Sequence, residues 1–187
     1  MGKLILRISV SMDGFMESSQ GKIDFSKSRS PEGAARVGEI MGQAGAHLVG
    51  RKAFCEMASF WPTAAGPIAK HMNEIPKIVF SKKGFDPAQA TSAKGWAGAK
   101  VLTGDLVEEI ADLKKQTAKD LLAHGGIEFA RNLVQTGLVD EYCIATHPVA
   151  AGKGSGLFEK LGKPLYLKLI ESKVFGTGAM LNIYRPE

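Results

Sequence analysis

Short apolar runs bounded by turn-forming residues predict a series of β-strands along the first two thirds of the chain. The first run covers residues 3–10 (KLILRISV) and is closed by the turn sequence Met12-Asp13-Gly14. Residues 46–50 (AHLVG) have the continuous apolar character of a buried strand. The same kind of run predicts further strands at residues 77–81, 99–103 and 120–124.

Between these strands, apolar residues recur every three or four positions, which predicts helices. The first helix, from about 31 to 43, has Ser30 as its N-cap and Pro31 as its first residue. The last helix ends at Gly137, a residue that readily adopts the left-handed conformation after a helix. Other helices are predicted after Gly50 toward Trp61, after Asp105, and from near Ile127.

The last third of the chain is rich in strands, with candidates at residues 139–149, 164–175 and 178–186. Strands and helices alternate up to about residue 137, which is typical of an α/β fold with a mixed, mostly parallel sheet and helices on both faces. Two or three antiparallel C-terminal strands are expected to complete this sheet. Because 187 residues fit one domain and no linker or repeat divides them, a single domain over residues 1–187 is expected.

Composition and charge narrow the function. With 44% hydrophobic and 23% charged residues, the chain has the composition of a globular protein. No apolar stretch approaches the ~20 residues that cross a bilayer, and the first run lacks the features of a signal peptide, so no membrane partner is expected. The net charge of +5 admits a nucleic acid or a small anion as partner. Since the basic residues are scattered, a small molecule is favoured, and a steep salt dependence of binding would indicate nucleic acid instead.

Cysteine and histidine are sparse and dispersed. Cys55 and Cys143 lie far apart without a C-x-x-C motif, which favours a reducing, cytoplasmic location. The four histidines, His47, His71, His124 and His147, are scattered along the chain, so no metal site is predicted.

Three basic or glycine-rich segments follow predicted strands. Gly50-Arg51-Lys52 and His124-Gly125-Gly126 each lie where a strand passes into a helix, and Lys82-Lys83 follows another strand. The carboxyl ends of parallel strands meet at the ligand-binding edge of such a sheet. Free N–H groups at helix starts favour phosphate there. Each segment alone is most often a turn or a surface feature, but a single dinucleotide would use all three.

These segments resemble the dihydrofolate reductase-like superfamily, in the branch of the riboflavin-biosynthesis reductase (RibD C-terminal) domain and its stand-alone relatives. The resemblance covers nearly the whole chain and is most specific from the double glycine through GLVDE to HPV and G-x-G. It rests on SMDGF (11–15), GRKAF (50–54), FW (60–61), KIVFSK (77–82), LLAHGGIEFARNLVQTGLVDEY (121–142), HPVAAGKGSGLF (147–158) and GAMLNIY (178–184).

The resemblance implies a three-layer fold, NADPH as cofactor and a cis peptide at Gly125-Gly126, beside the cofactor. It would place the pyrophosphate near Ile127, the adenosine-side phosphates near residues 50–52 and the 2′-phosphate near residues 81–83. The implied cofactor-binding residues are Val10, Gly50, Arg51, Lys52, Ser81, Lys82, Lys83, Gly125, Gly126, Ile127 and Glu128.

The activity implied by the resemblance is hydride transfer to a small heterocycle, pterin- or pyrimidine-like, or to a carbonyl compound near the 11–25 loop. Candidate substrate-binding residues are Asp13, Phe15 and Trp61. Candidate proton donors are the carboxylates Asp13, Asp24 and Glu32, although turn and helix-start roles explain Asp13 and Glu32 more simply. Relatives commonly pair through their C-terminal strands, so a homodimer using residues 139–149 is expected.

Two positions depart from the pattern of the resembled family. Ala53 and Cys55 stand where G-R-x-T-x-E has threonine and glutamate. Loss of a capping hydroxyl typically costs ~1 kcal/mol, so weaker cofactor binding is expected. An alternative is therefore a catalytically silent nucleotide-binding protein with the same fold. The sequence also lacks the H-x-E and P-C-x-x-C motifs of a fused deaminase.

Overall fold

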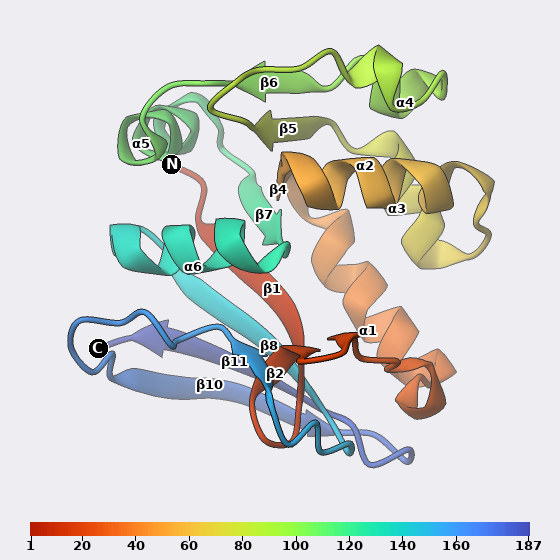
Figure 1. The fold of residues 1–187 in the computed structure, drawn as a ribbon, viewed down its shortest axis with the longest axis vertical. Coiled ribbons are helices and arrows are strands. Elements are labelled where there is room, and N and C mark those ends of the chain that lie inside the picture. The colour runs from red at the N-terminus through yellow and green to blue at the C-terminus, as the bar shows by residue number, and fades with distance from the viewer.

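A computed structural model describes the backbone of residues 1–187 and every side chain except that of Pro67. An eight-stranded sheet runs through the molecule in the order β10-β11-β8-β1-β7-β4-β5-β6 (Figure 1). Its strands are β1 (Leu4–Ser11), β4 (Ala44–Gly50), β5 (Lys77–Phe80), β6 (Lys100–Leu102), β7 (Asp120–His124), β8 (Glu141–His147), β10 (Leu167–Val174) and β11 (Met180–Pro186).

The sheet is mixed and mostly parallel, as predicted. The strands from β8 across to β6 all pair in parallel, whereas β11 pairs antiparallel with both β8 and β10. The predicted strand at residues 139–149 is β8, which pairs in parallel with β1. In this sheet, the antiparallel pairs are those that β11 forms with its two neighbours. Consequently the carboxyl ends of six strands lie along one edge of the sheet.

Helices cover both faces and complete the three layers (Figure 1). One core cluster joins the sheet to α5 and α6, and a second joins its other face to α1, α2, α3 and α4. The helices are α1 (Pro31–Gly42), α2 (Arg51–Phe60), α3 (Pro67–Glu74), α4 (Lys94–Ala97), α5 (Leu106–Gln116) and α6 (Ile127–Thr136), with short 3-10 turns at Ser26–Ser28, Trp61–Thr63 and Pro87–Gln89.

The predicted helix boundaries are confirmed by their capping geometry. The Ser30 side chain accepts a hydrogen bond from the Gly33 N–H, and the Asp105 carboxylate accepts from Val107 and Glu108 N–H groups. Gly137 has a φ of 68°, the left-handed conformation that ends α6. Capping is local chemistry, which explains why the sequence alone located these ends.

Several short elements were not predicted. A second sheet of three strands contains β2 (Phe15–Ser18), β3 (Gly21–Lys22) and β9 (Gly154–Gly156) in the order β3-β2-β9. β9 has no apolar pattern of its own and is a strand because it pairs with β2, far away in sequence. The short helices α3 and α4 were also missed. In the part of the chain that is described, no helix has the length and apolar character to cross a membrane.

Candidate functional site

A cavity of about 610 Å³ lies at the carboxyl edge of the parallel strands. Its wall is formed by the starts of α2, α5 and α6 and by the turn after β5. This first cavity is lined by most of the predicted cofactor residues, namely Gly50, Arg51, Lys52, Ser81, Lys82, Gly126, Ile127 and Glu128. The fold thus brings three separate strand-end segments to one cavity.

Two helices begin at the first cavity without a side-chain cap. Gly50 is the N-cap of α2 and Gly126 is the N-cap of α6, so neither can cap its helix with a side chain. The first-turn N–H groups and the helix dipoles therefore favour an anion such as phosphate. A β-carbon on Gly50 would lie 2.9 Å from Cβ of Phe129, so only glycine permits this close approach of α6.

The basic and acidic side chains of the first cavity differ in their partners. Three basic residues have no ion-pair partner among the described side chains: Arg51, Lys52 and Lys82. Two of the acidic residues are already engaged, since Glu56 pairs with Lys22 at 2.8 Å and Asp105 caps α5. Glu17, in β2, has no such partner among the described residues. The unpaired charge in this wall is therefore mainly positive, which suits a phosphorylated ligand.

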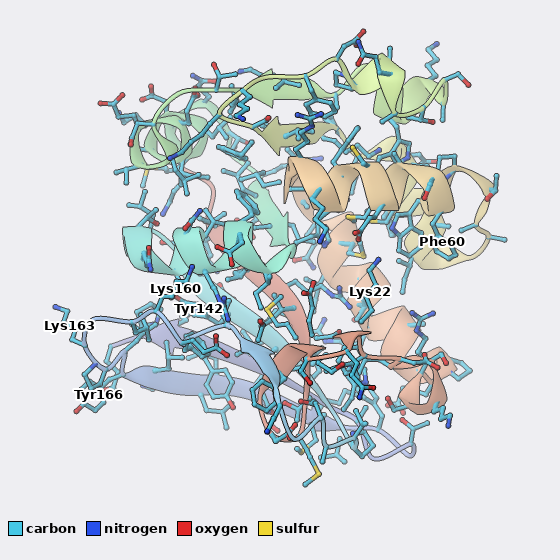
Figure 2. All side chains as sticks on the ribbon, in the orientation of Figure 1. Lys22, Phe60, Tyr142, Lys160, Lys163 and Tyr166 are labelled. Carbon is cyan, nitrogen blue, oxygen red and sulfur yellow. The ribbon has the colours of Figure 1, made fainter. Side chains whose placement is uncertain are left out.

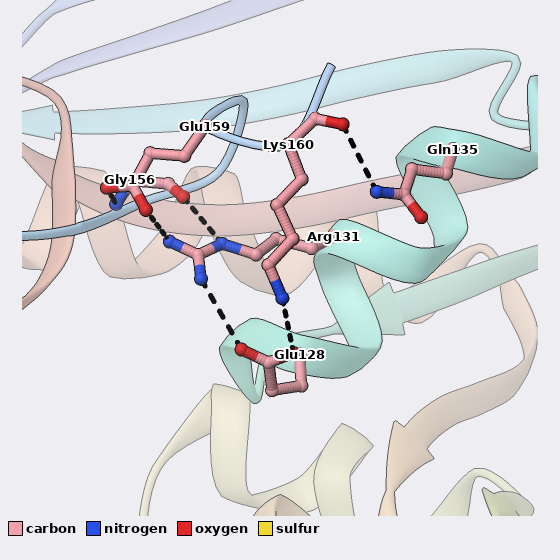
Figure 3. Close-up of polar contacts among 6 residues, drawn as sticks. All are labelled: Glu128, Arg131, Gln135, Gly156, Glu159 and Lys160. Atoms are coloured by element: carbon pink, nitrogen blue, oxygen red, sulfur yellow. Dashed lines mark hydrogen bonds and ion pairs between the residues drawn. The ribbon is translucent and has the colours of Figure 1, made fainter. Parts of the chain in front are cut away.

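Glu128, in the first turn of α6, belongs to a charged network (Figure 3). Its carboxylate pairs with Lys160 at 3.2 Å and with Arg131 at 3.4 Å, and Lys160 is the main group that lowers its pKa. Arg131 also donates to the Gly156 carbonyl at 2.9 Å and pairs with Glu159. The network ties α6 to the segment around β9 and offsets the negative charge of Glu128 beside the helix start.

A second cavity, of about 460 Å³, lies between the sheet and the helices α1, α2 and α3. Its polar lining residues are Arg7, Ser9, Ser28, Arg29, Ser30, His124 and His147. The rest of the wall is mostly apolar and includes Phe25, Met57, Phe60, Trp61 and Phe175. No aspartate or glutamate of the described residues lines it. An apolar cavity with a few convergent polar groups is the usual form of a small-molecule site.

The two cavities meet at the double glycine. His124 lines the second cavity, Gly126 lines the first, and the peptide bond between Gly125 and Gly126 is cis, as the resemblance implied. α2 also separates them, because Ala53 lines the first cavity and Met57 lines the second. The two cavity walls are therefore adjacent at the double glycine and along α2.

Histidine side chains at the second cavity are uncharged near neutral pH. His124 is hydrogen-bonded through Nε2 to Nδ1 of His47 at 2.8 Å, and both side chains are buried. Burial lowers the pKa of His47 to about 4 and that of His124 well below its usual value. Burial also lowers the pKa of His147, whose Nδ1 lies 2.7 Å from the Ser28 hydroxyl oxygen.

None of the three predicted proton donors lines either cavity. The Asp13 carboxylate accepts hydrogen bonds from the Ser11 hydroxyl and from the Ala151 and Gly152 N–H groups, which lower its pKa to about 2. It joins two loops and is ionised at neutral pH. The other two candidates are surface residues: Asp24 accepts from the Ser26 N–H at 2.8 Å, and Glu32 pairs with Lys173 at 3.0 Å. The structure therefore does not place any of these three carboxylates in a cavity wall.

Of the other predicted site residues, some line a cavity and others lie outside both cavities. Trp61 lines the second cavity, whereas Phe15 lies in β2 and lines neither. Val10 is buried in a core cluster, and Lys83 is exposed in the turn after β5. A β-carbon on Gly125 would lie 3.1 Å from Cε of Met16, which shows how close the 11–25 loop comes to the double glycine.

Sequence reasoning missed most of the second cavity. Arg7 and Ser9 lie within β1, and His124 ends β7, where each fits an ordinary strand pattern. Arg7 is the register partner of His124 on the neighbouring strand, a relation that only the pairing reveals. The one available signal was Arg7 itself, a charge in the middle of an otherwise apolar strand.

The fold and the two cavities define a reductase-like α/β protein of the dihydrofolate reductase type. Residues 2–181 match the RibD C-terminal domain family, and the chain belongs to that family, whose members typically use NADPH. It is 29% identical over 182 residues to the uncharacterized protein YyaP of Bacillus subtilis (strain 168), covering 97% of this chain and 94% of YyaP.

Solved structures share the fold, and two of them illustrate the range of the match. One, from Shewanella sp. PV-4 and provisionally assigned to riboflavin biosynthesis, has a TM-score of 0.77 and 24% identity, with 99% of each chain covered. The other is a diaminohydroxyphosphoribosylaminopyrimidine deaminase/5-amino-6-(5-phosphoribosylamino)uracil reductase from Thermotoga maritima. Its TM-score is 0.71 at 15% identity, and the match covers all of this chain but 57% of that one.

Proposed function

We propose that this protein is an NADPH-dependent reductase that acts on a small heterocyclic substrate, pterin- or pyrimidine-like, or on a carbonyl compound. The observation that carries the proposal is the pairing of two different cavities across one glycine junction. The first offers uncapped helix starts and unpaired basic side chains, and the second is apolar and partly enclosed. That division suits a charged dinucleotide beside a flat substrate.

The donor set of the first cavity fits a phosphorylated dinucleotide. The first-turn N–H groups of α6, after Gly126, and those of α2, after Gly50, would hold phosphate groups with help from Arg51. Ser81 and Lys82, at the end of β5, would hold the 2′-phosphate that distinguishes NADPH from NADH. When bound, NADPH supplies the hydride, and the chain binds and orients both reactants.

The second cavity would hold the substrate. Trp61 lies in its wall beside Phe60, with ring centroids 5.0 Å apart, and Met57 adds a flexible apolar surface. Such side chains can enclose a flat molecule and exclude water from the reacting atoms.

The test has two stages. NADPH and NADH are first titrated into the purified protein by calorimetry, and saturable binding with NADPH the tighter ligand is expected. Turnover is then measured as NADPH consumption with a panel of pterins, pyrimidines and carbonyl compounds. Absence of NADPH binding would refute the proposal at the first stage.

A second candidate function is nucleotide binding without turnover. It is favoured by the absence of the three predicted proton donors from both cavities, by the absence of any carboxylate from the wall of the second, and by Ala53 in the wall of the first. Tight NADPH binding with no consumption across the panel would support it, and steady consumption with any compound would exclude it.

We also propose that two copies of the chain pair through the C-terminal hairpin. β8 has both edges paired within the chain, so the segment at 139–149 offers no free edge. β10 is the edge strand at the antiparallel side of the sheet. Exposed apolar side chains lie along or just before it, including Tyr166 (71% exposed; Figure 2), Leu169 and Val174. A free edge with exposed apolar groups favours pairing with a second chain. A molar mass corresponding to the monomer at micromolar concentration would contradict this.

A further inference from the structure

Arg7 has no protein partner in the second cavity. Its side chain projects from the central strand β1 into the cavity wall, and none of its N–H groups makes a hydrogen bond or ion pair with a described residue. Its Nε is buried, and burial lowers the pKa of the guanidinium. A guanidinium has five N–H donors and stays charged in proteins, so a buried one without an acceptor is costly unless a ligand supplies one.

The surroundings do not neutralise this charge. No carboxylate of the described residues lines the cavity, and the nearby histidines His124 and His147 are uncharged at neutral pH. The only other charged group in the wall is Arg29, which is exposed and also positive. The cavity therefore has a net positive charge at its polar end.

Two serine side chains of the cavity wall are already hydrogen-bonded within the chain. The Ser28 hydroxyl donates to the Phe25 carbonyl and also lies within hydrogen-bond distance of His147. Ser30 caps α1 by accepting a hydrogen bond from the Gly33 N–H at 3.0 Å. The start of α1 therefore has a side-chain cap, unlike the helix starts at the first cavity. Of the two arginines in the wall, Arg29 is exposed, whereas Arg7 is partly buried and its Nε is fully buried, so Arg7 is the enclosed donor offered to a ligand. One planar guanidinium matches one planar carboxylate through two parallel hydrogen bonds.

We propose that the second cavity binds a flat carboxylic acid, with its carboxylate on Arg7 and its apolar body against the aromatic wall that includes Phe25 and Trp61. This inference rests on the proposed function, because it names the class of substrate as an unphosphorylated aromatic, heteroaromatic or conjugated monoacid. A phosphate ester, with three charged oxygens, would match more than one guanidinium, and the second arginine of the wall, Arg29, is exposed.

Three bicyclic probes of matched shape test the proposal by calorimetry on the whole chain, with and without saturating NADP⁺. They are 2-naphthoate, its neutral analogue 2-naphthamide, and 2-naphthyl phosphate. We expect 2-naphthoate to bind at least about tenfold more tightly than 2-naphthamide, as is typical of hydrogen bonds to charged groups. Equal affinities, including no binding of either probe, would overturn the proposal, and so would tighter binding of the phosphate ester.

Variants locate the site. Arg7→Met keeps an extended apolar side chain and should abolish the preference for 2-naphthoate, whereas Lys27→Met removes a nearby exposed charge and should preserve it. A preference that persists in folded Arg7→Met would refute the role of Arg7, and the wild-type probe comparison decides the question if that variant fails to fold. Titration of NADP⁺ into wild type tests the proposed cofactor site separately. Failure of NADP⁺ to bind would contradict the proposed function, whereas failure of the naphthoate preference would contradict only the carboxylate site.

Discussion

The two cavities offer a ligand different kinds of contact. The first relies on backbone N–H groups at the starts of α2 and α6 and on exposed basic side chains that follow strands. The second relies on a partly buried arginine, neutral histidines and an aromatic wall supplied by distant elements. A charged dinucleotide can be held at a solvent-accessible edge, whereas discrimination among small substrates requires enclosure and buried polar groups. The following predictions test this contrast.

The largest effect is expected at the double glycine. Gly126→Val should reduce NADPH affinity by about a hundredfold or more, because a branched side chain would occupy the approach to the first turn of α6. Gly162→Val is the matched control, since a β-carbon there meets no atom within 4 Å. Calorimetric titration of both folded variants gives the comparison. Unchanged affinity in Gly126→Val would mean that the glycines serve only the turn.

The second cavity should respond separately. Trp61→Ala should weaken binding of 2-naphthoate by about tenfold through loss of aromatic contact, while NADPH affinity stays the same. Tyr166→Ala removes an exposed aromatic side chain elsewhere and serves as the control. Parallel loss of NADPH affinity in Trp61→Ala would show that the cavities are not independent.

A smaller effect is expected at the end of β5, where two adjacent lysines differ in position. Lys82 lines the first cavity and Lys83 does not. Lys82→Ala should therefore lower the preference for NADPH over NADH by about fivefold, corresponding to ~1 kcal/mol for one exposed charged contact, whereas Lys83→Ala should change it little. Titration of both nucleotides at fixed salt measures this. Equal effects of the two variants would remove the assignment of Lys82 to the 2′-phosphate.

The smallest effect on either cavity is expected from Asp13→Asn, which should alter stability and not ligand affinity. The folded pKa of Asp13, about 2, is lower than the ~3.9 of an unfolded aspartate. Its ionised form therefore contributes stability above pH ~4, and the contribution is lost as the pH falls toward 2. Urea unfolding at several pH values should show a wild-type advantage at neutral pH that shrinks in acid. A large loss of NADPH affinity would instead indicate a role at the site.

Local features of the chain were enough to predict much of the fold. Caps such as Ser30 and Asp105, and the C-terminal glycine Gly137, act within a few residues of their own position. Apolar periodicity likewise identifies elements that pack against a sheet. β9 and α3 were missed because their formation depends on contacts with distant or neighbouring elements more than on their own pattern.

The first cavity could be anticipated from the sequence by itself, and the second was decided by the tertiary structure. Gly50 and Gly126 lie where a strand passes into a helix, and Lys82 lies in the turn after β5. Parallel strands bring such positions to one edge whatever the details of packing. Arg7 and His124 become neighbours only because β1 pairs with β7 in one register. The burial of His124 and of the Arg7 Nε depends on how helices from other parts of the chain pack over the sheet, which no local pattern encodes.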